Sequence, residues 1–417
     1  MKKILFIAVL LFGNFTYSQL SKNVLFLGNS YTGVNNLPQL TADLAVSAGD
    51  NLSFDSNTPG GYTFSGHSTN ATSLQKIQAG NWDFVVLQEQ SQLPSFPIGQ
   101  VQTACFPYAT ILDSIIREYN SCAETMFYMT WGRETGDAQN CASWPPVCTY
   151  NGMDSLLRLR YEQMAIDNQA ILSPVGALWH YIRQNNPLLQ LYASDGSHPN
   201  AAGSYAAACS FYSTIFRKDP TLITDNYGLS ATDALTIRNA AKIVVYDSLL
   251  TWHVGEFDPV ANFPAVYQVN NFTVQFTNLS TNATTYSWDF GDGATSNAIN
   301  PVHTYSSPIF YSVQLIAEDC GQTDTIVQIV ELVAQGLDES KLLNLQINPN
   351  PAKDFINVQI ENADQISLTN LQGEIIQVPI QKIGDSYKLD VSLLSKGLYF
   401  IKAEKDGNVY SGKIIKE

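Results

Sequence analysis

Basic side chains are scarce in this chain of 417 residues. It has 22 lysines and arginines against 37 aspartates and glutamates, which gives a formal net charge of −15 at pH 7. Nucleic acids and anionic membrane surfaces both bind basic protein faces, so we expect neither as a partner. We interpret the acidity as a contribution to solubility. Charged residues make up only 14% and hydrophobic residues 45%, which indicates folded domains rather than disorder.

Long apolar runs and metal-ligand clusters are also missing from the sequence. Beyond the N-terminus, no segment approaches the roughly 18 apolar residues of a membrane-spanning helix. The five histidines and six cysteines form no CxxC pair and no cluster with zinc-ligand spacing. We therefore expect no transmembrane segment in the mature chain, no metal and no other cofactor.

The N-terminus has the pattern of a secretory signal peptide. Lys2 and Lys3 precede an apolar run at 4–12, and a short polar stretch with small residues follows at 13–19. We expect cleavage near Ser18, so residues 1–18 should not belong to the folded mature protein. The mature protein is expected to be exported.

Export makes disulfides possible. Cys141 and Cys148 flank a short Trp-Pro-Pro loop, so they are the first predicted pair. Cys105 with Cys122 is the second predicted pair. Cys209 lies in an Ala-rich stretch that we expect to be helical, where it would be a buried thiol.

Between residues 22 and 255, short apolar runs alternate with helical stretches, and a chain of this length predicts two to four domains. Strands are expected at 24–27, 84–87 and 125–129, and helices at 37–48, 108–119, 153–169, 201–216 and 231–250. Buried strands that alternate with helices predict a parallel sheet with helices on both faces, a three-layer α/β fold.

From about residue 256 the chain becomes rich in Asn, Thr and Ser, and period-two alternation at 272–276 predicts half-buried strands. The WDFGDG segment at 288–293 and the HTY segment at 303–305 resemble the signatures of PKD domains. The resemblance implies an immunoglobulin-like β-sandwich over 262–334. The Gly-Asp-Gly turn would reverse a hairpin, and Trp288 would fill the core between the sheets. A calcium site built from the acidic residues is the alternative to this turn-forming role.

After a short linker at 333–340, residues 341–417 contain a second all-β pattern. NPNP at 348–351, GLYF at 397–400 and a terminal KIIK segment resemble the C-terminal sorting domain of type IX secretion substrates in Bacteroidetes. The resemblance implies that the type IX secretion machinery is a partner, and that the protein is then released or held at the cell surface. A second binding sandwich is the alternative.

Two short segments carry the candidate chemistry. Ser30 lies in GNSYT at 28–32, between a buried run and an expected helix, where its hydroxyl would project above the carboxyl edge of the sheet. The free N–H groups of the helix start could hold an oxyanion. Asp195 and His198 lie in DGSHP, and together they could supply the base and the orienting carboxylate that a serine nucleophile needs. Each segment by itself has a composition that is common in turns, so neither alone indicates a catalytic site.

Taken together, GNSYT and DGSHP resemble the first and last sequence blocks of SGNH (GDSL-like) hydrolases. The resemblance implies an SGNH domain over 19–258, with Ser30 as nucleophile, His198 as general base and then acid, and Asp195 as the residue that orients His198. It also implies an oxyanion hole that includes the N–H groups of Ser30 and Gly61.

One block departs from the family pattern. The family has an Asn donor in a GxND segment after the third strand, and this chain has VVLQEQS at 85–91 instead. Gln carries the same amide on a longer arm, so Gln88 is the first candidate for the missing donor and Gln90 the second. Loss of one such donor typically costs about 10²–10³ in turnover. The variant pattern, with GGYTFSGH at 60–67, resembles an SGNH subgroup found in Bacteroidetes.

Four further residues are candidates for substrate contact. His67 would line the pocket or would be a hydrogen-bonded loop histidine, and Glu89 would be a pocket acid or a buried partner of a neighbouring donor. Trp131 and Arg133 follow an expected strand at the same sheet edge.

The expected function is hydrolysis of carboxyl esters through an acyl-enzyme. The expected substrate is a small-molecule or polysaccharide ester, in particular O-acetyl groups on carbohydrate. Two alternatives remain at this point: a catalytically weak or inactive surface protein that binds glycans, and a lipase-like enzyme with a preference for long acyl chains.

Overall fold

The computed structural model describes residues 19–264, 268–270, 272–332 and 343–417. The expected signal peptide and the expected linker at 333–340 lie outside these residues. The chain divides into two compact units between Phe257 and Asp258, and each is described by itself.

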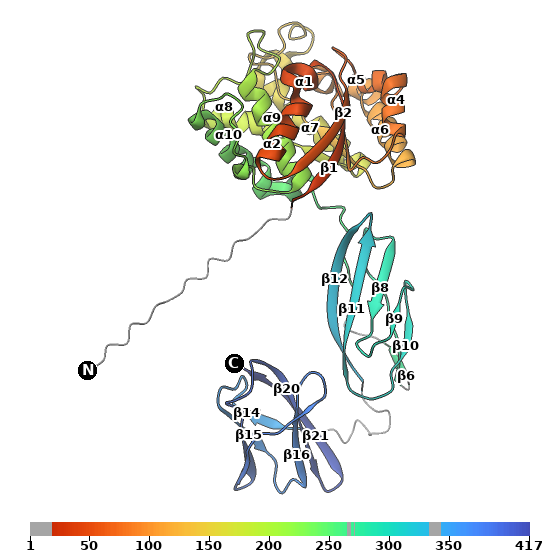
Figure 1. Ribbon diagram of the computed structural model, residues 1–417, viewed down its shortest axis with the longest axis vertical. Helices are drawn as coiled ribbons and strands as arrows, with labels where there is room; N and C mark the ends of the chain where they lie inside the picture. Colours follow the sequence, from red (N-terminus) through yellow and green to blue (C-terminus); the bar gives the residue numbers. More distant parts are fainter. Residues whose placement is uncertain (1–18, 265–267, 271, 333–342) are drawn as a thin grey trace, which may run out of the picture. The chain divides into compact units, whose positions relative to one another are not determined.

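The N-terminal unit is built on a parallel five-stranded sheet with the order β2-β1-β3-β4-β5 (Figure 1). Its strands are β1 Ser21–Leu27, β2 Asn51–Asn57, β3 Phe84–Leu87, β4 Glu124–Tyr128 and β5 Ile171–Ser173. All four residues of β3 are buried, as expected of a strand covered on both faces.

Helices cover both faces of this sheet, with α2, α8, α9 and α10 on one side and α4, α5 and α6 on the other (Figure 1). The helices are α1 Ser30–Gly33, α2 Leu37–Ser47, α3 Phe64–His67, α4 Ala71–Gln78, α5 Ile98–Ala104, α6 Phe106–Tyr119, α7 Tyr150–Asn168, α8 Val175–Asn185, α9 Ala201–Phe216 and α10 Ala231–Val244. The predicted three-layer α/β fold is confirmed. The helix expected at 231–250 ends earlier, at Val244, and a 3-10 turn at Tyr246–Trp252 follows it.

The register of the sheet decides where the functional residues gather. Leu27 at the end of β1 pairs with Asn57 at the end of β2 and with Leu87 at the end of β3. The segments that follow these three strands therefore leave the sheet side by side at its carboxyl edge, where open α/β folds bind their ligands.

The C-terminal unit holds two all-β bodies, each with its own apolar core. The first has sheets of order β10-β7-β6 and β12-β11-β8-β9. Its strands are β6 Gln268–Asn270, β7 Thr273–Gln275, β8 Thr285–Asp289, β9 Thr295–Ser296, β10 Val302–Thr304, β11 Phe310–Asp319 and β12 Gln322–Glu331. Trp288 is completely buried and packs against the rings of Phe263 and Phe276, as a core-filling role requires.

The acidic residues of the turn between β8 and β9 accept hydrogen bonds from the turn itself and from β10. Asp289 accepts the N–H of Gly291, and Asp292 accepts the N–H of Ala294. Asp292 also accepts from His303 Nε2 at 2.8 Å. These contacts favour the turn-forming interpretation over a calcium site.

The second all-β body has sheets of order β13-β21-β20-β16-β17 and β14-β15-β19-β18. Its strands are β13 Leu343–Asn344, β14 Gln346–Asn348, β15 Phe355–Gln359, β16 Gln365–Thr369, β17 Ile375–Ile376, β18 Ile380–Ile383, β19 Ser386–Asp390, β20 Gly397–Lys405 and β21 Asn408–Lys416. The final strand β21 pairs with β20 along its whole length, so the C-terminal motif lies inside a sheet.

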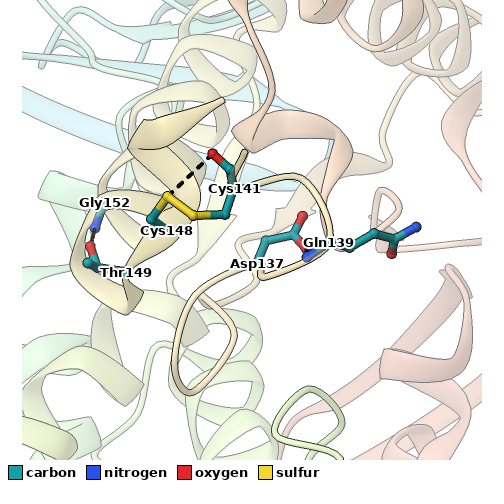
Figure 2. Close-up of a disulfide and its surroundings, with 6 residues drawn as sticks. All are labelled: Asp137, Gln139, Cys141, Cys148, Thr149 and Gly152. Carbon is teal, nitrogen blue, oxygen red and sulfur yellow. Dashed lines mark hydrogen bonds between the residues drawn. A yellow bond between two sulfur atoms is a disulfide. The ribbon is translucent and has the colours of Figure 1, made fainter. Parts of the chain in front are cut away.

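The cysteines follow the predictions in part. Cys141 and Cys148 form a disulfide that closes the loop after β4 (Figure 2). Cys209 is a buried free thiol, as predicted, but Cys105 is also free and buried, so the Cys105–Cys122 pairing is wrong. The Cys105 thiol points into the core instead, 3.7 Å from the sulfur of Met164.

Among the described residues, no helix combines the length and apolar character needed to cross a membrane. Over the same residues, no three or more His, Cys, Asp or Glu side chains gather in a way that could hold a metal ion.

Candidate active site

Ser30 is the first residue of α1, directly after a tight turn at the end of β1. Asn29 caps this helix, and its side-chain oxygen accepts the N–H of Tyr31 at 3.1 Å. The N–H of Ser30 has no hydrogen-bond acceptor among the described residues. The nucleophile candidate thus carries both a hydroxyl and a free N–H at the start of a helix, where anionic groups are stabilised.

The structure brings Ser30, His198 and Asp195 into one hydrogen-bonded chain. His198 Nε2 lies 2.9 Å from Ser30 Oγ, and His198 Nδ1 lies 2.5 Å from Asp195 Oδ2. An ionised carboxylate can only accept, so Nδ1 carries the ring proton and Nε2 is left to accept from the Ser30 hydroxyl. This is the tautomer that a general base for Ser30 needs.

Asp195 is held in its ionised form. Partial burial raises its pKa, but hydrogen bonds from the His198 ring and from the N–H groups of Ser197 and His198 lower the pKa of Asp195 to about 2. Both N–H groups donate to Oδ1 at 2.9 Å, which leaves Oδ2 for the imidazole. The carboxylate of Asp195 therefore stays charged across the neutral range of pH.

Several contacts fix the loop that carries Asp195 and His198. The carbonyl of Ser197 accepts from Trp131 Nε1 at 3.0 Å, and the hydroxyl of Ser197 lies 2.6 Å from that of Tyr31. Trp131 is completely buried, with its ring stacked between those of Tyr31 and Trp179 at 4.9 and 3.8 Å. Trp131 therefore supports the loop from inside the core, and the expected substrate contact is corrected.

The segment that follows β2 lies against the Ser30 turn, as the oxyanion-hole interpretation requires. The side-chain amide of Asn29 donates to the carbonyl of Tyr62 at 2.9 Å. Neighbouring Gly61 is exposed, has φ +68°, and its N–H has no acceptor among the described residues. Glycine adopts this backbone conformation without strain. The N–H groups of Ser30 and Gly61 are thus both available to an oxyanion, and their shared role in an oxyanion hole stays a prediction.

Both glutamine candidates hydrogen-bond to neighbouring chain segments through their side-chain amides. Gln88 is completely buried, its Oε1 accepts from the N–H of Asn29 at 2.9 Å, and its Nε2 donates to the carbonyl of Glu89. Gln90 donates its Nε2 to Gln92 Oε1 at 3.1 Å. Gln88 is corrected as a direct oxyanion donor because its amide is completely buried, whereas a donor role for half-buried Gln90 stays a prediction.

His67 is also completely buried rather than lining a pocket. Its Nδ1 lies 2.7 Å from Ser73 Oγ and its Nε2 lies 2.9 Å from the carbonyl oxygen of Gly28. Burial lowers the pKa of His67, although the bond to Gly28 raises it. The ring is therefore neutral and belongs to the support of the nucleophile turn.

Glu89 is a buried acid behind the site. Its carboxylate oxygens accept the N–H of Phe64 at 3.0 Å and the N–H of Gln90 at 2.5 Å. Burial raises the pKa of Glu89 to about 8, although these two N–H groups lower it. This location fits the alternative of a buried partner for neighbouring donors.

We expect Glu89 to make stability fall as pH rises. In the unfolded chain a Glu has a pKa near 4.3, so between about pH 5 and 8 the native state keeps a proton that unfolding releases. The free energy of unfolding should drop by up to about 1.4 kcal/mol per pH unit in this window. In Glu89→Gln this contribution should vanish, which urea unfolding of both proteins from pH 5 to 8 would measure. Replacement of the exposed Glu118 by Gln is the control, and parallel wild-type and Glu89→Gln curves would contradict the expectation.

Arg133 is the substrate-contact candidate that stays partly exposed. Its Nη1 donates to Asp137 Oδ1 at 3.1 Å, and Asp137 is completely buried. Asp137 lies just before the loop closed by the disulfide (Figure 2), where its carbonyl accepts the N–H of Cys141, and its carboxylate also accepts from Gln92 and Asn140, both at 2.7 Å. The ion pair with buried Asp137 therefore holds the guanidinium of Arg133 in place. Sequence reasoning missed Asp137, whose spacing of four residues from Arg133 was the available signal.

Two family models match segments of the C-terminal unit. Residues 258–333 match the PKD domain, and residues 346–417 match the secretion system C-terminal sorting domain. Both resemblances are confirmed. The sorting domain indicates handling by type IX secretion, and therefore export to the medium or the cell surface.

Several proteins of known structure are similar to the N-terminal unit. A DUF4886 family protein from Bacteroides uniformis is 17% identical, with a TM-score of 0.48, over 55% of this chain and 95% of its own. A protein assigned as an SGNH hydrolase from Slackia heliotrinireducens is 26% identical, with a TM-score of 0.40, over 47% and 99%. An acetyl xylan esterase is 15% identical, with a TM-score of 0.33, over 46% and 99%.

Among curated proteins, collagenase ColQ1 of Bacillus cereus (strain Q1) is 30% identical over 117 residues. The match covers 27% of this chain and spans only 11% of the collagenase.

Proposed function

We propose that the N-terminal unit is a secreted serine esterase that cleaves carboxyl esters through an acyl-enzyme. The observation that carries the proposal is the hydrogen-bonded chain from Ser30 through His198 to Asp195, with distances of 2.9 and 2.5 Å. A serine hydroxyl becomes nucleophilic when a base accepts its proton and a carboxylate orients that base.

In the first half-reaction Ser30 Oγ attacks the ester carbonyl and its proton moves to His198 Nε2. The Asp195 carboxylate stabilises the imidazolium that forms. The free N–H groups of Ser30 and Gly61 stabilise the oxyanion. His198 then gives its proton to the departing alcohol, which leaves an acyl group on Ser30. In the second half, His198 takes a proton from water, the hydroxide attacks the acyl carbon, and Ser30 recovers its proton as the acid leaves.

The substrate we propose is an O-acetyl group on carbohydrate. The side chains of His198 and Asp195 are 33% and 49% exposed, so the bulky alcohol half of a polysaccharide ester can approach them. The export that the sorting domain indicates brings the enzyme to extracellular polymers.

The test is a substrate series with purified protein. We expect p-nitrophenyl acetate to be cleaved faster than the butyrate and octanoate esters, and acetate to be released from acetylated xylan. A preference for octanoate would favour a lipase-like enzyme. Wild-type protein that is inert toward esters of every chain length would overturn the proposal.

A second candidate function is a weakly active or inactive surface protein that binds glycans. The observation in its favour is Gln88, whose amide is used inside the fold and does not replace the Asn donor of the family. A fluorophosphonate probe that fails to label Ser30 while glycan binding persists would favour this candidate.

A further inference from the structure

The peptide unit that joins Gly28 and Asn29 is held at both of its polar atoms. Its carbonyl oxygen accepts from His67 Nε2 at 2.9 Å, and its N–H donates to Gln88 Oε1 at 2.9 Å. Both side chains are completely buried. They come from different segments, His67 from α3 and Gln88 from the end of β3. Two separate segments thus hold one peptide, and that peptide lies one residue before Ser30.

The donor and the acceptor in each hydrogen bond of His67 can be assigned. A carbonyl oxygen can only accept, so His67 Nε2 carries the ring proton and Nδ1 accepts from the Ser73 hydroxyl at 2.7 Å. The Ser73 oxygen accepts in turn from Asn57 Nδ2 at 2.8 Å. This chain of donors starts at the last residue of β2, so the sheet itself fixes the His67 ring.

The hydrogen bonds of the Gln88 side chain can be assigned in the same way. Its Oε1 accepts a second hydrogen bond, from Thr32 Oγ1 at 2.9 Å, while its Nε2 donates to the carbonyl of Glu89. The packing leaves no room for a side chain at Gly28. A Cβ there would lie 2.4 Å from Thr32 Oγ1 and 2.8 Å from Gln88 Oε1.

We infer that His67 and Gln88 are positioning residues that form a peptide clamp on Gly28–Asn29 and thereby aim Ser30. The inference rests on the proposed esterase function. A peptide unit is planar, so fixing its oxygen and its N–H stops its rotation. Only the two backbone angles of Asn29 then separate the clamp from Ser30. The clamp sets both the distance from Ser30 Oγ to His198 and the direction of the Ser30 N–H toward an oxyanion.

The clamp also gives the departure from the family pattern a physical role. Gln88 contributes to oxyanion stabilisation through the orientation of the Ser30 N–H, rather than through its own amide. Groups misplaced by about 1 Å in a reacting constellation cost about 10²-fold in rate. Loss of one arm of the clamp should therefore lower turnover strongly without removing any group that touches the substrate.

A pair of His67 substitutions separates positioning from general stability. In His67→Gln the side-chain amide reaches the position of Nε2 and can still donate to the Gly28 carbonyl. In His67→Asn the amide reaches only the position of Nδ1, so it keeps the contact with Ser73 and loses the one with Gly28. We expect His67→Asn to lower kcat on p-nitrophenyl acetate by about 10- to 100-fold, with KM within about 3-fold and the pH profile unchanged. We expect His67→Gln to stay within about 5-fold of wild type.

A double-mutant cycle tests whether both residues act on the same peptide. Gln88→Met keeps the length of the side chain and removes its hydrogen bonds, so it should lower kcat by about 10-fold or more. Because the peptide is released by the first loss, the combined His67→Asn/Gln88→Met variant should lose far less than the product of the single effects. Circular dichroism and thermal melts check that each variant is folded, and His67→Gln supplies the comparison if His67→Asn is not.

The outcomes distinguish the clamp from the function on which it rests. Wild-type protein without esterase activity and without labelling of Ser30 by diisopropyl fluorophosphate would overturn both. An active wild type with a folded His67→Asn of equal kcat would overturn the clamp alone. Equal losses in His67→Gln and His67→Asn, or strictly multiplicative effects in the double variant, would also overturn it.

Discussion

Ser30→Ala should lower kcat for p-nitrophenyl acetate by at least about 10⁴-fold. The substitution removes the oxygen that forms the acyl-enzyme but keeps the backbone N–H that would stabilise the oxyanion. The remaining groups can then favour only direct attack by water, which is slow without a covalent intermediate. KM should change little, because the Ser30 hydroxyl contributes little to ground-state binding.

The measurement is steady-state hydrolysis with spontaneous hydrolysis subtracted. Ser194→Ala is the matched control, because Ser194 is exposed on the same loop as His198 and makes no hydrogen bond among the described residues. It should behave as wild type. Activity above about 1% in Ser30→Ala would remove Ser30 from the role of nucleophile.

Asp195→Asn should lower kcat by about 10⁴-fold through the tautomer of His198. The N–H groups of Ser197 and His198 both point at Oδ1, so in the variant the amide oxygen must take that position. The amide NH₂ then faces His198 Nδ1 and requires it to accept. The ring proton moves to Nε2, and Nε2 can no longer accept the proton of Ser30.

The loss in Asp195→Asn should hold across the neutral range of pH. In the wild type the pKa of Asp195 is lowered to about 2, so its carboxylate does not titrate in that range. A pH–rate profile of both proteins between pH 5 and 9 measures this. A drop of less than about 10-fold would show that the carboxylate does not set the tautomer.

The fold could be predicted from local sequence patterns because the length and hydrophobic pattern of each segment favour one type of secondary structure. The apolar runs before Gly28 and before Gln88 are too short for a buried helix, so their length and full burial favour central strands. The disulfide was predictable for a similar reason, since Cys141 and Cys148 lie on one short loop. Cys105 was not predictable, because its place in the core depends on how α5 and α6 pack onto the rest of the unit.

The candidate site was predictable where the groups lie on one segment. Asp195 and His198 share a loop, so their spacing already indicated contact, and Ser30 was the strand-to-helix serine that could meet them. The direction of Gln88 was not encoded in any one segment. Its side-chain oxygen is held by hydrogen bonds from Asn29 and Thr32, which lie more than fifty positions earlier in the chain. Trp131 was misjudged for the same reason, because its burial depends on Tyr31 and Trp179.

The central claim is that Ser30 is a nucleophile activated by His198 and Asp195. Incubation of the purified protein with a fluorophosphonate, followed by peptide mass spectrometry, tests it most directly. The account predicts one adduct per chain, on the peptide that contains Ser30, with none in Ser30→Ala and much slower labelling in His198→Ala. An adduct on another residue, or labelling of Ser30 at an equal rate in His198→Ala, would contradict it.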